Sequence, residues 1–135
     1  MSMNESTALD VLAKATSGLL FLSETDAPLV PFFWPNEDTA PLAPARLLEL
    51  ANAKPDSPIK TVTLAHFFRN ATKEEAWHNE EEQAEVERFK ALVATLKSTL
   101  KKPQVFRVGE VSIDVYIVGL VEGGYAGLQT RVVET

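Results

Sequence analysis

The stretch QVFRVGEVSIDVYIVGLVEGGYAGLQTRVV, residues 104–133, decides the fold class. Apolar and polar residues alternate along much of it, a period of two that is typical of strands with one buried face. With turns near Gly109 and at Gly123-Gly124, the predicted strands span residues 104–108, 111–120 and 128–133. One face of the middle strand is expected to carry Val111, Ile113, Val115 and Ile117. Successive strands joined by short turns predict antiparallel pairing in this part of the chain.

Before this stretch the apolar period lengthens to between three and four residues, which predicts one long helix. Its apolar stripe consists of Val86, Phe89, Val93, Leu96 and Leu100. Glutamates come early in the segment and lysines late, an order that complements the helix dipole. Pro103 is expected to stop the helix, because proline lacks the amide hydrogen that a further turn would need.

The first part of the chain shows shorter elements. Residues 6–16 are predicted to form a helix, with Gly18 as its C-terminal cap. Leu19 to Leu22 is either a buried strand or a passage from helix to strand. Residues 29–34 are strand-like, and Pro31 within them indicates an edge strand or a bulge.

The middle of the chain completes the predicted order of elements. Pro44 is placed for the first turn of a second helix, and residues 59–62 for a short strand. Thr63 is expected to cap a brief helix, and Thr72 with Glu75 has the form of a capping box. Helices first and strands last predict an α+β fold with an antiparallel or mixed sheet. The length fits one domain, residues 1–135.

The composition limits the kinds of partner. The chain carries 13 Lys and Arg against 19 Asp and Glu, a net charge of −6, which disfavours direct binding to nucleic acid. An acidic balance favours a basic partner, although it also serves solubility alone. The sequence has no cysteine, no signal-peptide pattern after Met1 and no apolar run long enough to cross a membrane. We therefore expect a cytoplasmic protein that binds neither a membrane nor nucleic acid.

An acidic block from Glu74 to Glu87 is the first candidate for a binding site, since it contains no Lys or Arg. It could present carboxylates to a basic cleft, or it could be the solvated first half of the long helix. Trp77 lies inside this block and outside the apolar stripe of the helix. It could anchor an interface, or it could pack over the core as a staple at the start of the helix.

Two further candidates are a turn and the last residue. The turn Ser23-Glu24-Thr25-Asp26 offers two carboxylates to arginines or a metal ion, or is ordinary turn chemistry. Thr135 follows the last predicted strand almost directly, so its oxygen atoms are expected to be held in a fixed place. Carboxylate and hydroxyl oxygens suit Mg²⁺ or the water molecules bound to it.

Signatures of an enzyme are weak. His66 and His78 are the only histidines, and they form no metal-binding pair of known spacing. His78 close to Glu82 could hold a metal, but a solvated histidine on an acidic helix is the simpler interpretation. The segment 123–127 lacks the lysine and the following helix of a phosphate loop and is typical of a hairpin turn. We expect no catalytic activity and no cofactor or metal site of its own.

Several motifs together resemble the nuclease A inhibitor family. They are the run Ser17-Gly18-Leu19-Leu20-Phe21-Leu22-Ser23-Glu24, the run Phe67-Phe68-Arg69-Asn70-Ala71-Thr72 followed by Trp77, the run Lys102-Pro103-Gln104-Val105, then Arg107, Gly109-Glu110-Val111, Asp114-Val115-Tyr116, and Val132-Val133-Glu134-Thr135. The resemblance covers most of residues 6–34 and 59–135, whereas residues 35–58 have no residue-by-residue match.

The resemblance implies a fold and a mode of action. The fold would be a variant of the pathogenesis-related-1-like three-layer α/β/α sandwich. The chain would be a proteinaceous inhibitor that occludes the active site of a Mg²⁺-dependent, non-specific DNA/RNA endonuclease of the ββα-metal type. Glu24 and Thr135 would enter that active site, with Thr135 at the catalytic Mg²⁺ or its water shell. Trp77 would pack on the rim of the active site.

Three hypotheses therefore stand on the sequence. The first is the nuclease inhibitor. The second is an acidic interaction module that has the same fold and binds another basic protein. The third is an enzyme with a metal near His78 and Glu82, for which the residues give the least support.

Overall fold

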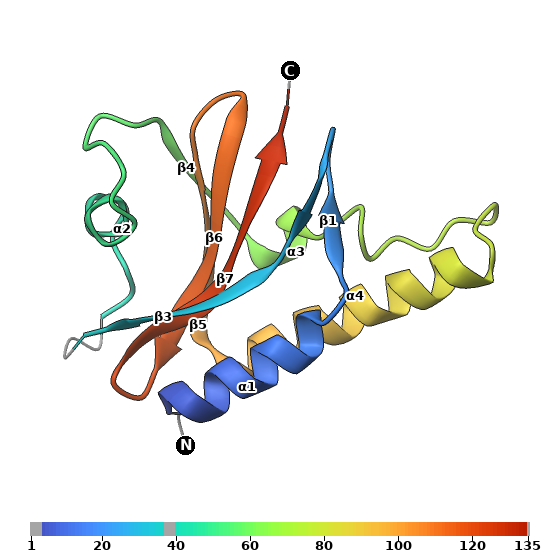
Figure 1. Ribbon diagram of the computed structural model, residues 1–135, viewed down its shortest axis with the longest axis horizontal. Coiled ribbons are helices and arrows are strands. Elements are labelled where there is room, and N and C mark those ends of the chain that lie inside the picture. The colour runs from blue at the N-terminus through green and yellow to red at the C-terminus, as the bar shows by residue number, and fades with distance from the viewer. Residues whose placement is uncertain (1–3, 37–39, 135) are drawn as a thin grey trace.

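A five-stranded antiparallel sheet with helices on both faces organises the computed structural model, which describes residues 4–36 and 40–134 (Figure 1). The order across the sheet is β3-β7-β6-β5-β4. The strands are β3 (Val30–Pro35), β4 (Ile59–Val62), β5 (Lys101–Val108), β6 (Ser112–Val121) and β7 (Gly124–Val133). The three predicted strands at the end of the chain are thus confirmed as an antiparallel meander, and the α+β class with them.

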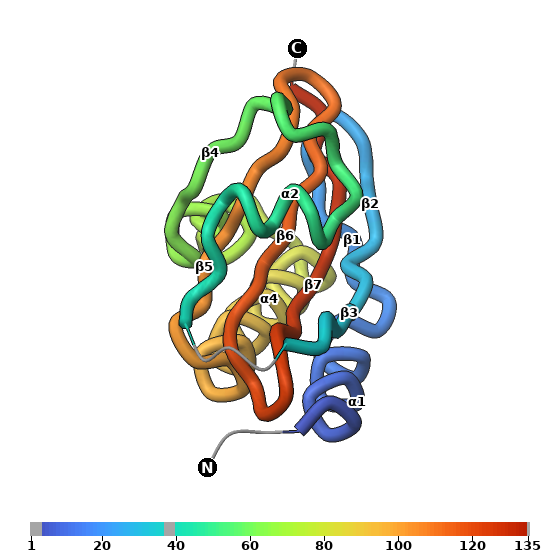
Figure 2. The backbone as a smooth tube through the Cα atoms, turned by 90° about the vertical axis from the view of Figure 1, so that its left-hand side faces the viewer, coloured from blue at the N-terminus to red at the C-terminus, as the bar shows by residue number. Residues whose placement is uncertain are grey.

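The helices divide between the two faces of the sheet. One face is covered by α1 (Glu5–Thr16), α3 (Leu64–Phe67) and α4 (Glu80–Thr99), and the other by α2 (Pro44–Leu50). Figure 2 looks across α2 onto the sheet, with α4 behind it. In the described part of the chain no helix is both long and apolar enough to cross a membrane.

Successive residues of β6 pack alternately into the two cores, one on each face of the sheet. Ile113, Val115 and Ile117 pack in the core shared with α1 and α4, while Tyr116 and Val118 pack in the core shared with α2. The prediction that Val111 shares the first face is wrong. Val111 precedes β6 and is 53% exposed, because the chain is still turning at this point.

The boundaries of β5 and β7 differ from the predicted ones. Helix α4 ends at Thr99, before Pro103 is reached, and β5 begins at Lys101. Pro103 therefore does not stop the helix but lies in β5, inside the bulge between Lys101 and Gln104. Strand β7 begins at Gly124 rather than at the predicted residue 128. The turn before it ends at Gly123, which has a positive φ of 86°, so the chain is already extended from Gly124.

A small hairpin forms a second, two-stranded sheet beside the main sheet. Strands β1 (Leu20–Leu22) and β2 (Asp26–Pro28) pair only with one another, so the predicted acidic turn is shorter than expected. The C-cap residue of α1 is Ser17 rather than the predicted Gly18, which follows it in the left-handed conformation with a φ of 76°. The chain then enters β3, which is an edge strand as Pro31 indicated.

The start of α4 corrects a further prediction. Thr72 is not in a capping box, because its hydroxyl donates to the carbonyl of Phe68 at 2.8 Å. Asn79 caps α4 instead, in a capping box with Glu82. The acidic block is therefore divided between a loop and the first turns of α4. Thr63 does cap α3, by accepting a hydrogen bond from the amide of His66.

Candidate functional site

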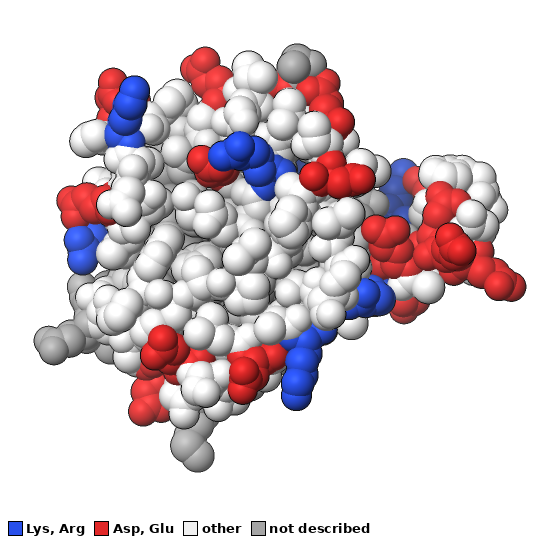
Figure 3. All heavy atoms as spheres, in the orientation of Figure 1, with Lys and Arg blue, Asp and Glu red and all other residues white. Residues whose placement is uncertain are grey.

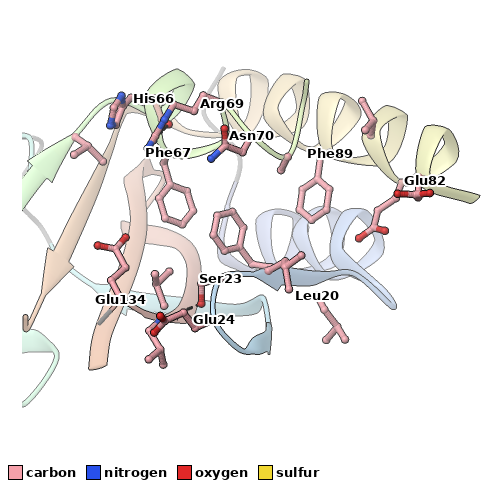
Figure 4. A pocket seen from close by; sticks show the side chains of 18 of the residues that line it. Leu20, Ser23, Glu24, His66, Phe67, Arg69, Asn70, Glu82, Phe89 and Glu134 are labelled. Atoms are coloured by element: carbon pink, nitrogen blue, oxygen red, sulfur yellow. Dashed lines mark hydrogen bonds between the residues drawn. The ribbon is translucent and has the colours of Figure 1, made fainter. Parts of the chain in front are cut away.

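A groove of about 600 Å³ lies between the β1–β2 hairpin, the end of β7 and the loop before α4. Residues from α3, α4 and the ends of β4 and β5 complete its lining. Figure 4 shows Glu24 and Glu134 together at one side and Glu82 at the other, with Phe67 and Phe89 between them. The groove therefore joins parts of the chain that are far apart in the sequence.

Aromatic side chains form the floor of the groove. The rings of Phe21 and Phe67 are stacked with centroids 4.5 Å apart, and Phe89 meets Phe21 edge-on. All three rings are buried and belong to the core under α1 and α4. Stacked and edge-on rings stabilise their own arrangement beyond simple burial, so the groove has a rigid base.

The turn that carries Glu24 is bound to the end of β7. The amide of Val133 donates to Ser23 Oγ at 3.0 Å, and the amide of Glu24 donates to the carbonyl of Val133 at 3.4 Å. Two hydrogen bonds thus fix the tip of the hairpin against the last strand. Glu24 itself is exposed and lines the groove.

The end of β7 is also held from the opposite side. The amide of Glu134 donates to the carbonyl of Val111 at 2.9 Å. The carboxylate of Glu134 forms an ion pair with Arg107 of β5, whose side chain is only 18% exposed. An ion pair with one partly desolvated member is screened less than a fully exposed pair, so this contact helps to direct Glu134.

Trp77 lies on the loop at the other edge of the groove and is 71% exposed. Its ring meets that of His78 edge-on, with centroids 4.4 Å apart. Because it joins neither core cluster, the alternative in which Trp77 packs over the core is wrong. An indole exposed to this extent has most of its surface available to a partner.

Contacts with α4 hold the loop that carries Trp77. Lys90 forms an ion pair with Glu74, and Gln83 donates to the carbonyl of His78 at 3.2 Å. His78 Nδ1 accepts a hydrogen bond from the amide of Glu75 at 3.2 Å. His78 is therefore a loop residue engaged with the backbone, which corrects the prediction of a solvated histidine on the helix. Among residues 4–36 and 40–134 no cluster of three or more His, Asp or Glu side chains could hold a metal.

These positions lie within a match to one protein family. Residues 6–135 match the family described as nuclease A inhibitor-like protein. The chain belongs to this family. The match includes residues 35–58, for which the sequence motifs gave no residue-by-residue correspondence. A comparison with curated proteins found no match.

Two of the three predicted contact residues of this nuclease A inhibitor-like chain line the same groove. They are Glu24, on the hairpin turn, and Trp77, on the loop before α4. The third, Thr135, lies outside the described residues. Its neighbour Glu134 lines the groove on the same side as Glu24 (Figure 4).

The sequence interpretation missed two apolar residues of the groove. Leu20 and Leu22 are 45% and 73% exposed, so the alternative in which residues 19–22 form a buried strand is wrong for these two side chains. A hairpin with one covered face buries only alternate residues, and here Phe21 is the buried one. Leu20, Leu22 and Trp77 are three exposed large apolar side chains that line the same groove.

Carboxylates gather over the start of α4, beside the groove. Figure 3 shows them as the projecting acidic end of the molecule, and they include Glu80, Glu81, Glu82 and Glu85. Glu82 and Glu85 also line the groove. The hydrogen bond from Lys90, together with its positive charge, lowers the pKa of the Glu74 carboxyl below its ordinary value of 4.5.

Proposed function

We propose that this chain inhibits a Mg²⁺-dependent, non-specific DNA/RNA endonuclease of the ββα-metal type by occluding its active site. Family membership supports a nuclease as the partner. The observation that carries the proposal is that Glu24 and Trp77, brought from distant segments, line one groove beside the end of β7. These are two of the three residues to which the sequence resemblance assigns inhibition, and the third is Thr135.

The chemistry of the groove suits a basic active site. In the proposal, Glu24 pairs with cationic side chains of the nuclease, where charge-assisted hydrogen bonds are strongest. Thr135 follows Glu134 directly in the sequence, and its oxygens reach the catalytic Mg²⁺ or its water shell, as the resemblance implies. Trp77 packs on the rim, because a large rigid side chain buries much area at little conformational cost.

The acidic surface assists the encounter. The carboxylates at the start of α4 flank the groove, and the whole chain carries a net charge of −6. Enzymes that hold a nucleic-acid backbone are positively charged where they do so. Opposite charges then steer the two proteins together before short-range contacts form.

Deletion of Thr135 tests the proposed mode of inhibition. Wild type at stoichiometric excess should abolish plasmid cleavage by the endonuclease. The deletion should raise the inhibition constant about tenfold or more, the loss expected for a contact residue at the centre of an interface. Its urea midpoint should equal that of wild type.

The matched control is Glu122→Gln, which removes a carboxylate at the turn before β7, at the other end of the strand from Glu134. This variant should inhibit as well as wild type does. An unchanged inhibition constant for the Thr135 deletion would contradict the proposed contact. Full cleavage with excess wild type would instead favour an acidic module that binds another basic protein.

We also propose the finer structural assignments that the resemblance implies. Residues 1–135 form one domain, and the helices on both faces of the sheet make it a variant of the pathogenesis-related-1-like α/β/α sandwich. The layering described above supports this assignment. In the proposal the chain acts in the cytoplasm and has no catalytic activity of its own.

A further inference from the structure

The hydroxyl of Ser23 makes the shorter of the two hydrogen bonds that join the turn carrying Glu24 to the last strand. Ser23 Oγ accepts the hydrogen bond from the amide of Val133, at 3.0 Å, and donates one to the carbonyl of Thr25, at 3.2 Å. A serine hydroxyl has one hydrogen to donate and lone pairs to accept with, so it makes both bonds at once. Ser23 therefore ties the two sides of the hairpin turn to β7.

The end of β7 is restrained on its other side as well. Successive backbone groups of a strand point in opposite directions. Val133 therefore bonds to the hairpin turn, whereas the amide of Glu134 bonds to the carbonyl of Val111. Arg107 adds an ion pair to the side chain of Glu134. The hairpin is thus attached to a strand end that is itself held in place.

We infer that Ser23 is a positioning residue for inhibition, because its hydroxyl fixes the Glu24 carboxylate relative to the end of β7. The inference rests on the proposed function. Glu24 makes the contact with the nuclease, and Ser23 acts through it. A surface that is already ordered loses less conformational freedom on binding. Without the hydroxyl, the amide of Val133 loses its acceptor, and only the longer bond from the amide of Glu24, at 3.4 Å, still joins the turn to β7.

A double-mutant cycle with Glu24 tests the inference. Inhibition constants are measured for wild type, Ser23→Ala, Glu24→Gln and the double variant, against a purified endonuclease of the ββα-metal type that cleaves plasmid DNA. Ser23→Ala should weaken inhibition about tenfold, the effect of one lost hydrogen bond at an ordered contact. In the Glu24→Gln background, Ser23→Ala should raise the inhibition constant by a much smaller factor, because the effects of substitutions at residues that act together are not additive.

Two further variants separate positioning from general stability. Ser23→Thr keeps the hydroxyl and should restore inhibition. Ser98→Ala removes an exposed hydroxyl that donates to the carbonyl of Thr95 on α4 and should leave inhibition unchanged. Amide hydrogen exchange at Val133 provides a readout without the nuclease, and exchange there should be faster in Ser23→Ala.

The outcomes distinguish the inference from the proposed function. If wild type inhibits and Ser23→Ala costs the same with and without Glu24→Gln, the inference is overturned and the proposed function stands. An unchanged exchange rate at Val133 in Ser23→Ala would also overturn the inference. If wild type does not inhibit, the proposed function fails and the inference falls with it.

Discussion

At the scale of single residues, the chemistry of the groove is ordinary, and its arrangement comes from the neighbours of each contact residue. Glu24 is an exposed glutamate on a hairpin turn, held through Ser23 and the backbone of Val133. Trp77 is an exposed indole on a loop that Lys90 and Gln83 tie to α4. Exposed side chains on fixed backbone can meet a partner without being ordered first.

The ion pair between Glu74 and Lys90 leads to a prediction about the pKa of the Glu74 carboxyl. The hydrogen bond from Lys90 lowers the pKa of Glu74, so folding favours the charged carboxylate. The resulting stabilisation is present above the pKa of the unfolded state and is lost as the pH falls through the lower pKa of the folded state. Both side chains are largely exposed, so this stabilisation is small.

The measurement is an NMR titration of the side-chain carboxyl carbons. In Lys90→Met the pKa of Glu74 should rise toward 4.5, and the amide signal of Trp77 should shift because its loop loses a contact. Lys97→Met, in the last turn of the same helix, controls for the loss of one positive charge. The same pKa for Glu74 in wild type and Lys90→Met would contradict the assigned cause.

At the scale of elements, the sequence predicted the helices and strands that have a strong apolar period or a proline or glycine that marks a boundary. The alternation in 111–120 and the apolar stripe of α4 each predict a regular element that packs against the core, and both elements are present. Pro31 correctly indicated an edge strand, since proline cannot donate to a neighbour on its N–H side. A strand was one of the two alternatives for residues 19–22, where β1 lies, but β2 and its pairing with β1 were not predicted, because a three-residue strand is too short to show a period.

Glu24 and Trp77 illustrate how far the sequence specifies the site. Each was a weak candidate by its own chemistry, and the resemblance to a family singled them out. Their proximity depends on how the hairpin and the loop before α4 pack on the same sheet, which is a tertiary property. The exposure of Leu22 is a tertiary property as well, because an apolar residue on an uncovered hairpin face cannot be told from a core residue by sequence alone.

The capping box at α4 gives a prediction at this scale. Asn79 accepts a hydrogen bond from the amide of Glu82 at 2.8 Å, and Glu82 accepts one from the amide of Asn79 at 3.3 Å. Asn79→Ala should lower the free energy of unfolding by about 1 kcal/mol, the usual cost of a lost N-cap. Urea denaturation measures it. Asn79→Asp keeps an acceptor and should remain close to wild type, and equal losses in the two variants would argue against the cap.

At the scale of the whole molecule, the sheet carries two cores and presents the groove at one end. The larger core, under α1 and α4, also supplies the aromatic floor of the groove. The carboxylates at the start of α4 project beside it (Figure 3). The packing of the layers thus brings the aromatic floor of the groove, the carboxylates of Glu24 and Glu134 and the indole of Trp77 to one groove.

The distribution of charge predicts how inhibition responds to salt. The net charge of −6 steers the chain toward a basic cleft. Raising the salt concentration from about 0.05 M to about 0.5 M shortens the range of this attraction several-fold. The association rate, measured by stopped-flow fluorescence, should therefore fall steeply, while the dissociation rate changes little. An association rate that does not depend on salt would contradict steering.

The most direct test of the central claim is a titration of the endonuclease with wild type and with the double variant Glu24→Gln, Trp77→Ala. Wild type should stop plasmid cleavage at one molecule per nuclease. The double variant should have the urea midpoint of wild type and inhibit at least about a hundredfold more weakly, since it lacks two central contacts. Inhibition by the double variant as strong as that of wild type, or uninterrupted cleavage with excess wild type, would contradict the claim that this groove occludes a nuclease active site.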